Sequence, residues 1–237
     1  MQTKTRPKDF DPEEAKTIAV QIVGTDPFWN NYSNQSASNK MDDILSWISD
    51  KWSTNIEDGS NEYDAGVTAQ YTGGVTIPAS ALPDNNALND RLYAADDWLK
   101  NNEGNLYSGA ESIVVVDYYG DDSGTYGWGY IGSAGDDDDI CGLVDTHHED
   151  NGNLPTELSN VESEGVGFHE LLHTFNAEHP SDVSTYSNRN YYDYISIMYS
   201  WDGVSCTDGG NTEIITDFTS SCATNSVRNY IDNNNLS

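Results

Sequence analysis

The chain has 237 residues, with 40 acidic against 10 basic side chains and a formal net charge of -30 at pH 7. This charge repels the phosphate backbone of nucleic acids, and no apolar run approaches the ~20 residues of a membrane span, so we expect neither partner. Because 36% of the residues are hydrophobic, we interpret the chain as folded, with a solvated acidic surface of the halophilic kind that concentrated salt screens.

The first half of the chain predicts strands that alternate with amphipathic helices. Runs of β-branched and apolar residues predict the strands, and apolar residues at helical spacing predict the helices. In chain order, we predict a strand at 17–23, a loop at 26–39, a helix at 41–52, a strand at 66–77 broken at its paired glycines, a helix at 88–99 and a buried strand at 112–117.

Glycines alternate with large residues in the next segment, and glycine in a strand lets another backbone approach closely. One interpretation is a bulged edge strand without a ligand, and the other is an edge strand that accepts a peptide as an additional strand. A further strand is predicted at 140–145 and a closing helix at 223–233. The candidate substrate-binding residues are Gly127, Trp128, Gly129, Tyr130, Ile131 and Gly132.

Several other polar features admit two interpretations. The four aspartates 136–139 are typical of a solvated loop, and calcium binding through their oxygens is the alternative. His147 and His148 are adjacent and alternate along a strand, so they indicate surface or supporting histidines more than a second metal site. Three cysteines allow at most one internal disulfide. Cys206 with Cys222 is the simplest pair, and pairing of Cys141 with either stays open.

The strongest pattern runs from His169 to His179, where His-Glu-x-x-His is followed by a third histidine six residues later. Residues four apart share one face of a helix, so His169 and His173 can present two imidazoles to one cation. Glu170 then lies beside the metal position as a candidate general base. His179 can join only if the helix ends in a sharp turn at about Asn176, where asparagine is second to glycine for a left-handed conformation.

A methionine follows in the segment Ser196-Ile197-Met198-Tyr199-Ser200. Together with the histidine pattern, this segment resembles the metzincin metallopeptidases, whose longer signature has glycine where this chain has Asn176. The adamalysin (reprolysin-like) branch is the most similar. Gly129-Tyr130-Ile131-Gly132 resembles the glycine-rich edge strand of this branch. The segment 142–147 resembles the strand before its zinc helix, and Glu178-His179 resembles the end of its zinc motif.

The resemblance implies an α+β fold, in which a twisted mixed five-stranded sheet has two long helices behind it and the zinc helix beneath. Residues 1–237 would form a single catalytic domain. Residues 17–179 would be an N-terminal lobe with the sheet and the zinc helix. Residues 180–237 would be a small, irregular C-terminal lobe that contains the methionine turn, with Met198 as an apolar floor below the histidines.

The implied function is a zinc-dependent endopeptidase with one catalytic Zn²⁺ held by His169, His173 and His179. Glu170 would take a proton from the attacking water and pass it to the leaving amine. We expect protein or peptide substrates, a monomer and an extracellular location. The first ten residues lack the apolar segment of a signal peptide, so either a leader is absent from this chain or the protein stays inside the cell as an intracellular hydrolase. The alternative is an inactive, zinc-stabilised module that binds peptides.

Overall fold

The computed structural model describes residues 16–57, 65–84, 87–120, 126–147, 162–177, 185–187, 193–195, 214–215, 219 and 221–236. Its central element is a five-stranded sheet with the order β2-β1-β3-β5-β4. All neighbouring strands are parallel except β4, which pairs antiparallel with β5 at one end of the sheet. The strands are β1 (Lys16–Thr25), β2 (Ala65–Ile77), β3 (Ser112–Asp117), β4 (Gly127–Gly129) and β5 (Cys141–Asp145).

The predicted strands at 17–23, 66–77, 112–117 and 140–145 are confirmed, and so is the expected mixed α and β architecture with a five-stranded sheet. In β2, the pairing with β1 shifts register between Tyr71 and Thr76, and Gly74 in this interval has φ +99°. The interruption predicted at the paired glycines is therefore a local irregularity in a continuous strand, because glycine adopts positive φ without a Cβ clash.

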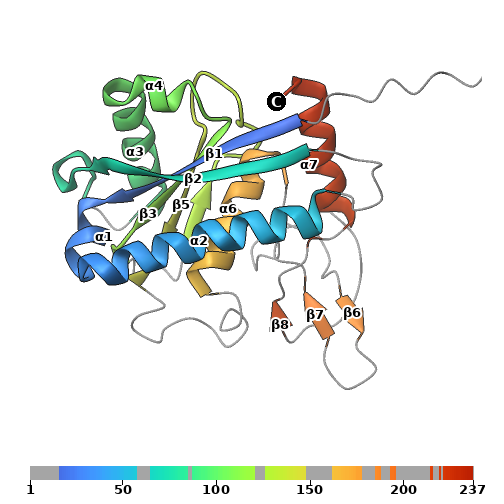
Figure 1. The fold of residues 1–237 in the computed structure, drawn as a ribbon, viewed down its shortest axis with the longest axis horizontal. Coiled ribbons are helices and arrows are strands. Elements are labelled where there is room, and N and C mark those ends of the chain that lie inside the picture. Colours follow the sequence, from blue (N-terminus) through green and yellow to red (C-terminus); the bar gives the residue numbers. More distant parts are fainter. Residues whose placement is uncertain are drawn as a thin grey trace, which may run out of the picture.

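Helices cover both faces of the sheet, which makes three layers (Figure 1). On one face lie α2 (Asn34–Asn55), α6 (Glu162–Thr174) and α7 (Ser221–Asn234), and on the other lie α3 (Leu88–Asn102) and α4 (Gly104–Tyr107). The expectation of two long helices together behind the sheet is wrong, since α2 and α3 pack on opposite faces. The physical reason is that β3 is apolar on both sides, as parallel strands covered by helices are.

The loop predicted at 26–39 is also wrong. This segment forms the short helix α1 (Asp26–Asn31) and the first turns of α2. Thr25 caps α1 by accepting a hydrogen bond from the Phe28 N–H, and Ser33 caps α2 by accepting one from the Ser36 N–H. Asn and Ser are common in loops, but here Ser33 is an N-cap, a position that both residue types favour.

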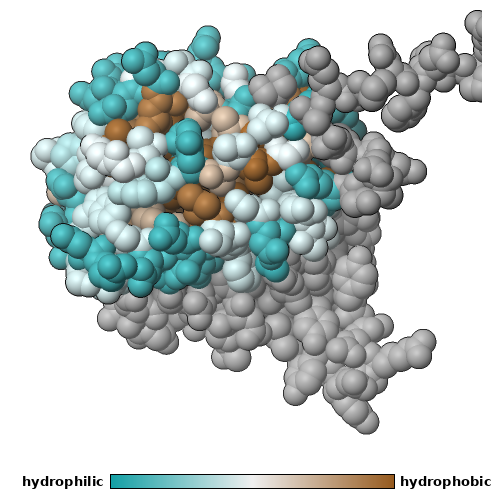
Figure 2. Space-filling model, viewed as in Figure 1, coloured by the Kyte–Doolittle hydropathy of each residue, from teal (hydrophilic) through white to brown (hydrophobic). Residues whose placement is uncertain are grey.

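The α2 helix confirms the amphipathic pattern predicted at 41–52. Its inner side chains, among them Met41, Ile44 and Trp52, are fully buried, and Asp42 and Asp43 are exposed. The face of the molecule drawn in Figure 2 is largely hydrophilic, with hydrophobic patches between the polar side chains. No helix among the described residues is long and apolar enough to cross a membrane.

The C-terminal part of the chain returns to this core. Helix α7 buries Ala223, Val227 and Ile231 in the same cluster as α2 and α6. Within the expected C-terminal lobe, the described residues also form a small sheet of β6 (Thr185–Ser187), β7 (Asp193–Ile195) and β8 (Ile214–Ile215). Cys141 is a free, buried thiol in β5. Cys206 lies outside the described residues, so pairing with Cys222 stays a prediction.

Candidate metal centre

Helix α6 carries the histidine pattern and packs on the sheet beside α2. Phe168, Leu171 and Leu172 are buried in the core on this side of the sheet. At Gly167, a Cβ would already lie 3.6–3.8 Å from Ile44, Val114 and Val144, which is ordinary packing contact. The helix therefore has close neighbours on both flanks, and its position under the strands β4 and β5 is set by packing.

The two histidines of the helix face one point, as their spacing predicts. The Nε2 atoms of His169 and His173 are 3.1 Å apart, and the ring planes cross at 79°. Two imidazole nitrogens bound to one tetrahedral Zn²⁺ at Zn–N distances near 2.0–2.1 Å lie about 3.4 Å apart. The pair is thus close to the separation that a zinc ion requires, so the residues present fit this metal.

A backbone contact fixes the orientation of the His173 ring. Its Nδ1 lies 2.7 Å from the Ala177 carbonyl oxygen. A carbonyl only accepts hydrogen bonds, so Nδ1 carries the proton and the Nε2 lone pair faces His169. Hydrogen bonds of this kind fix the tautomer and ring orientation of metal-binding histidines. His173 is 4% exposed, whereas His169 is partly exposed.

The helix ends as the sequence predicts, at Asn176, which has φ +63°. The Ala177 N–H donates to the Leu172 carbonyl and the Asn176 N–H donates to the His173 carbonyl. These two bonds form the Schellman motif, which closes helices through a left-handed residue. Ser226 of α7 also holds Asn176, because its hydroxyl donates to the Asn176 backbone carbonyl at 2.6 Å and accepts from the Asn176 side-chain amide at 3.3 Å. Asparagine therefore performs the turn for which the metzincin signature uses glycine.

Glu170 completes a compact group with the two histidines. Its carboxylate and the two imidazoles offer ligand-type atoms that all lie within 4.8 Å of one another, the one such group among the described residues. The side chain is 6% exposed, and burial raises the pKa of its carboxyl well above the usual range. A cation beside a carboxyl opposes this effect by favouring the charged form.

Two glycines of β4 leave the space in which Glu170 is buried against the sheet. A Cβ built on Gly127 would lie 2.6 Å from the Glu170 Cγ, and one on Gly129 would lie 2.6 Å from the Glu170 carbonyl oxygen. Gly142 of β5 approaches the same residue, with a Cβ position 3.1 Å from its carbonyl carbon. Glycines alternate with large residues in β4 because α6 packs closely against this edge of the sheet. Neither of the two interpretations of the sequence, a bulged edge strand or a peptide-binding edge strand, included this reason.

The predicted edge strand is shorter than expected. Only Gly127–Gly129 pair with β5, and the chain then turns back over the end of α6. The Gly132 N–H donates to the His173 carbonyl, and the N–H groups of Ser133 and Ala134 donate to the Thr174 carbonyl. The expectation that Tyr130, Ile131 and Gly132 continue the strand is wrong, because these bonds direct the backbone toward the helix terminus.

The remaining predicted site residues have different outcomes. Trp128 is 44% exposed on the side of β4 opposite the glycine contacts. His147 packs edge-to-face against Tyr118 and belongs to no metal-type group within the described ranges. His148, His179 and Met198 lie outside the described residues, so the third zinc ligand and the methionine turn stay predictions. The Ala177 carbonyl was missed because no sequence signal marks a backbone acceptor.

No family model and no curated protein matches this chain. Among solved structures, one described as "Structure of a chaperone-substrate complex" is similar, with a TM-score of 0.53 and 12% sequence identity. The match covers 91% of this chain and 34% of that chain, so this chain spans about a third of the length of the protein it matches. At this identity the likeness concerns the fold alone.

Proposed function

We propose that this protein is a zinc-dependent endopeptidase of metzincin type, secreted and adapted to high salt. The observation that carries the proposal is the group on α6, in which the Nε2 atoms of His169 and His173 are 3.1 Å apart and Glu170 lies within the same 4.8 Å group. The sequence adds His179 as the third ligand. Three protein ligands are typical of catalytic zinc sites, and structural sites have four.

In this proposal each side chain has one task. His169, His173 and His179 hold the metal, and the bond from the His173 Nδ1–H to the Ala177 carbonyl keeps the ring in its binding orientation. When bound, Zn²⁺ supplies a Lewis acid that polarises a peptide carbonyl and acidifies water. The Glu170 carboxylate accepts the proton of the attacking water and returns it to the nitrogen of the leaving amine.

The place of β4 supports a polypeptide substrate. It is the last strand in the described order of the sheet, and its partner β5 occupies only one of its two edges. Unpaired N–H and C=O groups on an edge bind extended peptides as an additional strand. Because Gly127 and Gly129 also touch Glu170, a peptide beside β4 would run directly past the proposed base.

A comparison of two variants in molar salt tests the proposal. The wild-type protein is expected to cleave unfolded casein, and a zinc chelator is expected to abolish the cleavage. Glu170→Gln keeps the shape of the side chain but removes the base, so this variant should keep one equivalent of zinc and lose turnover by several orders of magnitude. Asp43→Asn, an exposed change on α2, is the control and should retain activity. Undiminished casein cleavage by Glu170→Gln would refute the assigned base.

The alternative is a zinc-stabilised module that binds peptides without cutting them. The specific observation in its favour is that the similar solved structure is described as a chaperone–substrate complex. The near-complete burial of Glu170 also fits a supporting role for its carboxyl. This alternative predicts that unfolded substrates bind in molar salt, that no chelator-sensitive cleavage occurs, and that Glu170→Gln binds them as well as the wild-type protein does.

A further inference from the structure

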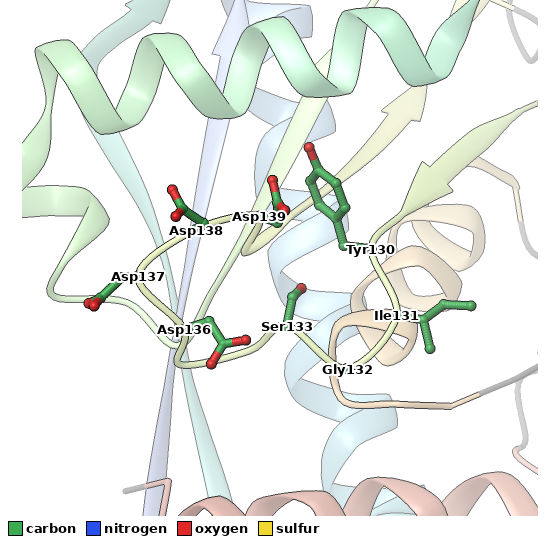
Figure 3. A pocket seen from close by; sticks show the side chains of 8 residues that line it. All are labelled: Tyr130, Ile131, Gly132, Ser133, Asp136, Asp137, Asp138 and Asp139. Carbon is green, nitrogen blue, oxygen red and sulfur yellow. The ribbon is translucent and has the colours of Figure 1, made fainter.

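The segment after β4 folds into a ring-shaped loop that surrounds a polar basin. The basin has a volume of about 440 Å³ and is lined by residues 130–133 and 136–139. Figure 3 shows the Ser133 hydroxyl pointing toward the middle of this ring and the Asp136 carboxylate turned toward the same side. The loop is fixed at its base, since the Gly135 N–H donates to the Glu111 carbonyl and the Tyr230 hydroxyl donates to the Ala134 carbonyl.

One buried polar group in the basin has no partner. The Ser133 side chain is only 6% exposed, and its oxygen makes no hydrogen bond with the described residues. A buried hydroxyl without a partner costs about 1–3 kcal/mol, so such a group is rare unless a ligand or water satisfies it. This buried hydroxyl without a partner, and not the acidic loop by itself, indicates a bound polar ligand.

The charge around the basin specifies a cation. Four carboxylates line it, and Lys100, the cation that pairs with this loop among the described residues, binds Asp138 at the exposed outer side. The carboxylates do not converge on one point, because they form no group of three ligand atoms within metal-binding range among the described residues. A single metal ion would therefore reach too few oxygens, whereas a guanidinium group spreads five N–H donors over a plane.

We propose that this basin binds the arginine side chain of a polypeptide. The guanidinium would donate to the Asp136 carboxylate and to the Ser133 hydroxyl, and the aliphatic stem would lie against Tyr130 and Ile131 at the rim. Ile131 is 57% exposed, and a contact with an apolar stem removes part of this surface from water. The volume also leaves room for a long side chain and a few waters.

The basin adjoins the candidate metal centre, which links the two. Gly129 of β4 leads directly into Tyr130, and the Gly132 N–H is bonded to the His173 carbonyl. A peptide extended beside β4 would therefore place one side chain at the basin. If the proposed endopeptidase function holds, on which this consequence alone rests, the enzyme prefers substrates with arginine at a fixed distance from the cleaved bond.

Binding of a peptide probe tests the proposal without requiring cleavage. A short fluorescent peptide with a single arginine is titrated into the Glu170→Gln protein in 1 M NaCl, alongside a twin in which neutral citrulline replaces the arginine. We expect the arginine peptide to bind at least 10-fold more tightly. Asp136→Asn should remove most of this preference, Ser133→Ala should weaken binding about 3-fold, and Asp43→Asn, which removes the same charge from α2, should change it less than 2-fold.

Three outcomes would overturn the assignment. These are equal binding of the two peptides, an equal loss in Asp136→Asn and Asp43→Asn, and saturable Ca²⁺ binding that Asp136→Asn abolishes while arginine shows no advantage. The first two would mean that the surface charge acts as a whole, and the third would identify a metal loop. Arginine binding without any cleavage would support the arginine site and refute the peptidase. Cleavage without a preference for arginine would support the peptidase and refute the arginine site.

Discussion

The close approach of α6 to β4 makes Gly129 the most informative position for a stability test. A methyl group at this position would lie 2.6 Å from the Glu170 carbonyl oxygen, 3.1 Å from the His173 Cβ and 3.2 Å from a Glu170 carboxylate oxygen. The nearest atom belongs to the helix backbone, which cannot rotate away as a flexible side chain would. Gly129→Ala must therefore move β4 and α6 apart.

The expected cost follows from two opposing effects. Overpacking a well-filled interior costs about 1–3 kcal/mol. Replacing a strand glycine lowers the entropy of the unfolded chain, which offsets about 0.5–1 kcal/mol. The net loss of unfolding free energy is about 0–2.5 kcal/mol, and a chain of this size loses about 2–4 °C in Tm per kcal/mol. Because the moving atoms belong to Glu170 and His173, zinc affinity should fall together with stability.

Thermal denaturation and zinc titration in molar salt measure both effects. The matched control is Gly104→Ala, since a Cβ there meets nothing within 4 Å and the glycine begins the short helix α4. This control should be neutral or stabilising by up to about 1 kcal/mol with unchanged zinc affinity. If Gly129→Ala matches the control in Tm and in zinc affinity, the reasoning that the glycines of β4 admit the helix is refuted.

Further predictions concern the helix end, a buried ion pair and the solvent. At φ +63°, alanine keeps the Cβ of Asn176 but lacks its polar side chain, so Asn176→Ala should cost about 1 kcal/mol in urea unfolding. Asn176→Gly removes the Cβ as well and should be neutral within about 0.5 kcal/mol. Arg91 binds Asp117 at 2.7 Å with both side chains almost fully buried, so Arg91→Leu should cost about 3–5 kcal/mol, and an unfolding curve like that of the wild-type protein would contradict this. The proposed zinc site predicts that a chelator lowers the Tm, because a ligand present at 100 times its Kd stabilises by about 2.7 kcal/mol. Dialysis into dilute buffer should abolish the near-UV circular dichroism of a chain with net charge -30, and a retained signal would count against the halophilic interpretation.

Sequence periodicity located most of the regular elements, because their signals are local. The strands at β1, β3 and β5 are apolar runs, and α2, α3 and α7 repeat apolar residues at helical spacing. The turn at Asn176 was also predictable, since the third histidine requires the helix to end there. These features depend on neighbours within a few residues, which is the range that a sequence pattern records.

Features that depend on distant contacts could not be read in this way. The division of α2 and α3 between the two faces depends on how each crossover packs, and β3 is apolar on both sides. The buried Arg91–Asp117 pair joins residues 26 positions apart, and neither residue stands out in the sequence. The length of β4 was overestimated because the backbone bonds of Gly132 and Ser133 to the end of α6 have no local signature.

The structure also changes the meaning of the glycine alternation in β4. Gly127 and Gly129 present their Cα hydrogens to Glu170, and Trp128 between them faces the opposite side, as successive residues of a strand do. The N–H and C=O groups of the strand lie in a third direction, within the plane of the sheet, where β5 occupies one edge. The helix therefore packs against one face of these three residues, whereas a peptide would bind to their free N–H and C=O groups at the edge. The two contacts do not compete. It follows that one short strand can fix the position of the proposed base on its inner face and align a substrate along its edge. The strand would then hold the base and the substrate backbone in a fixed position relative to each other.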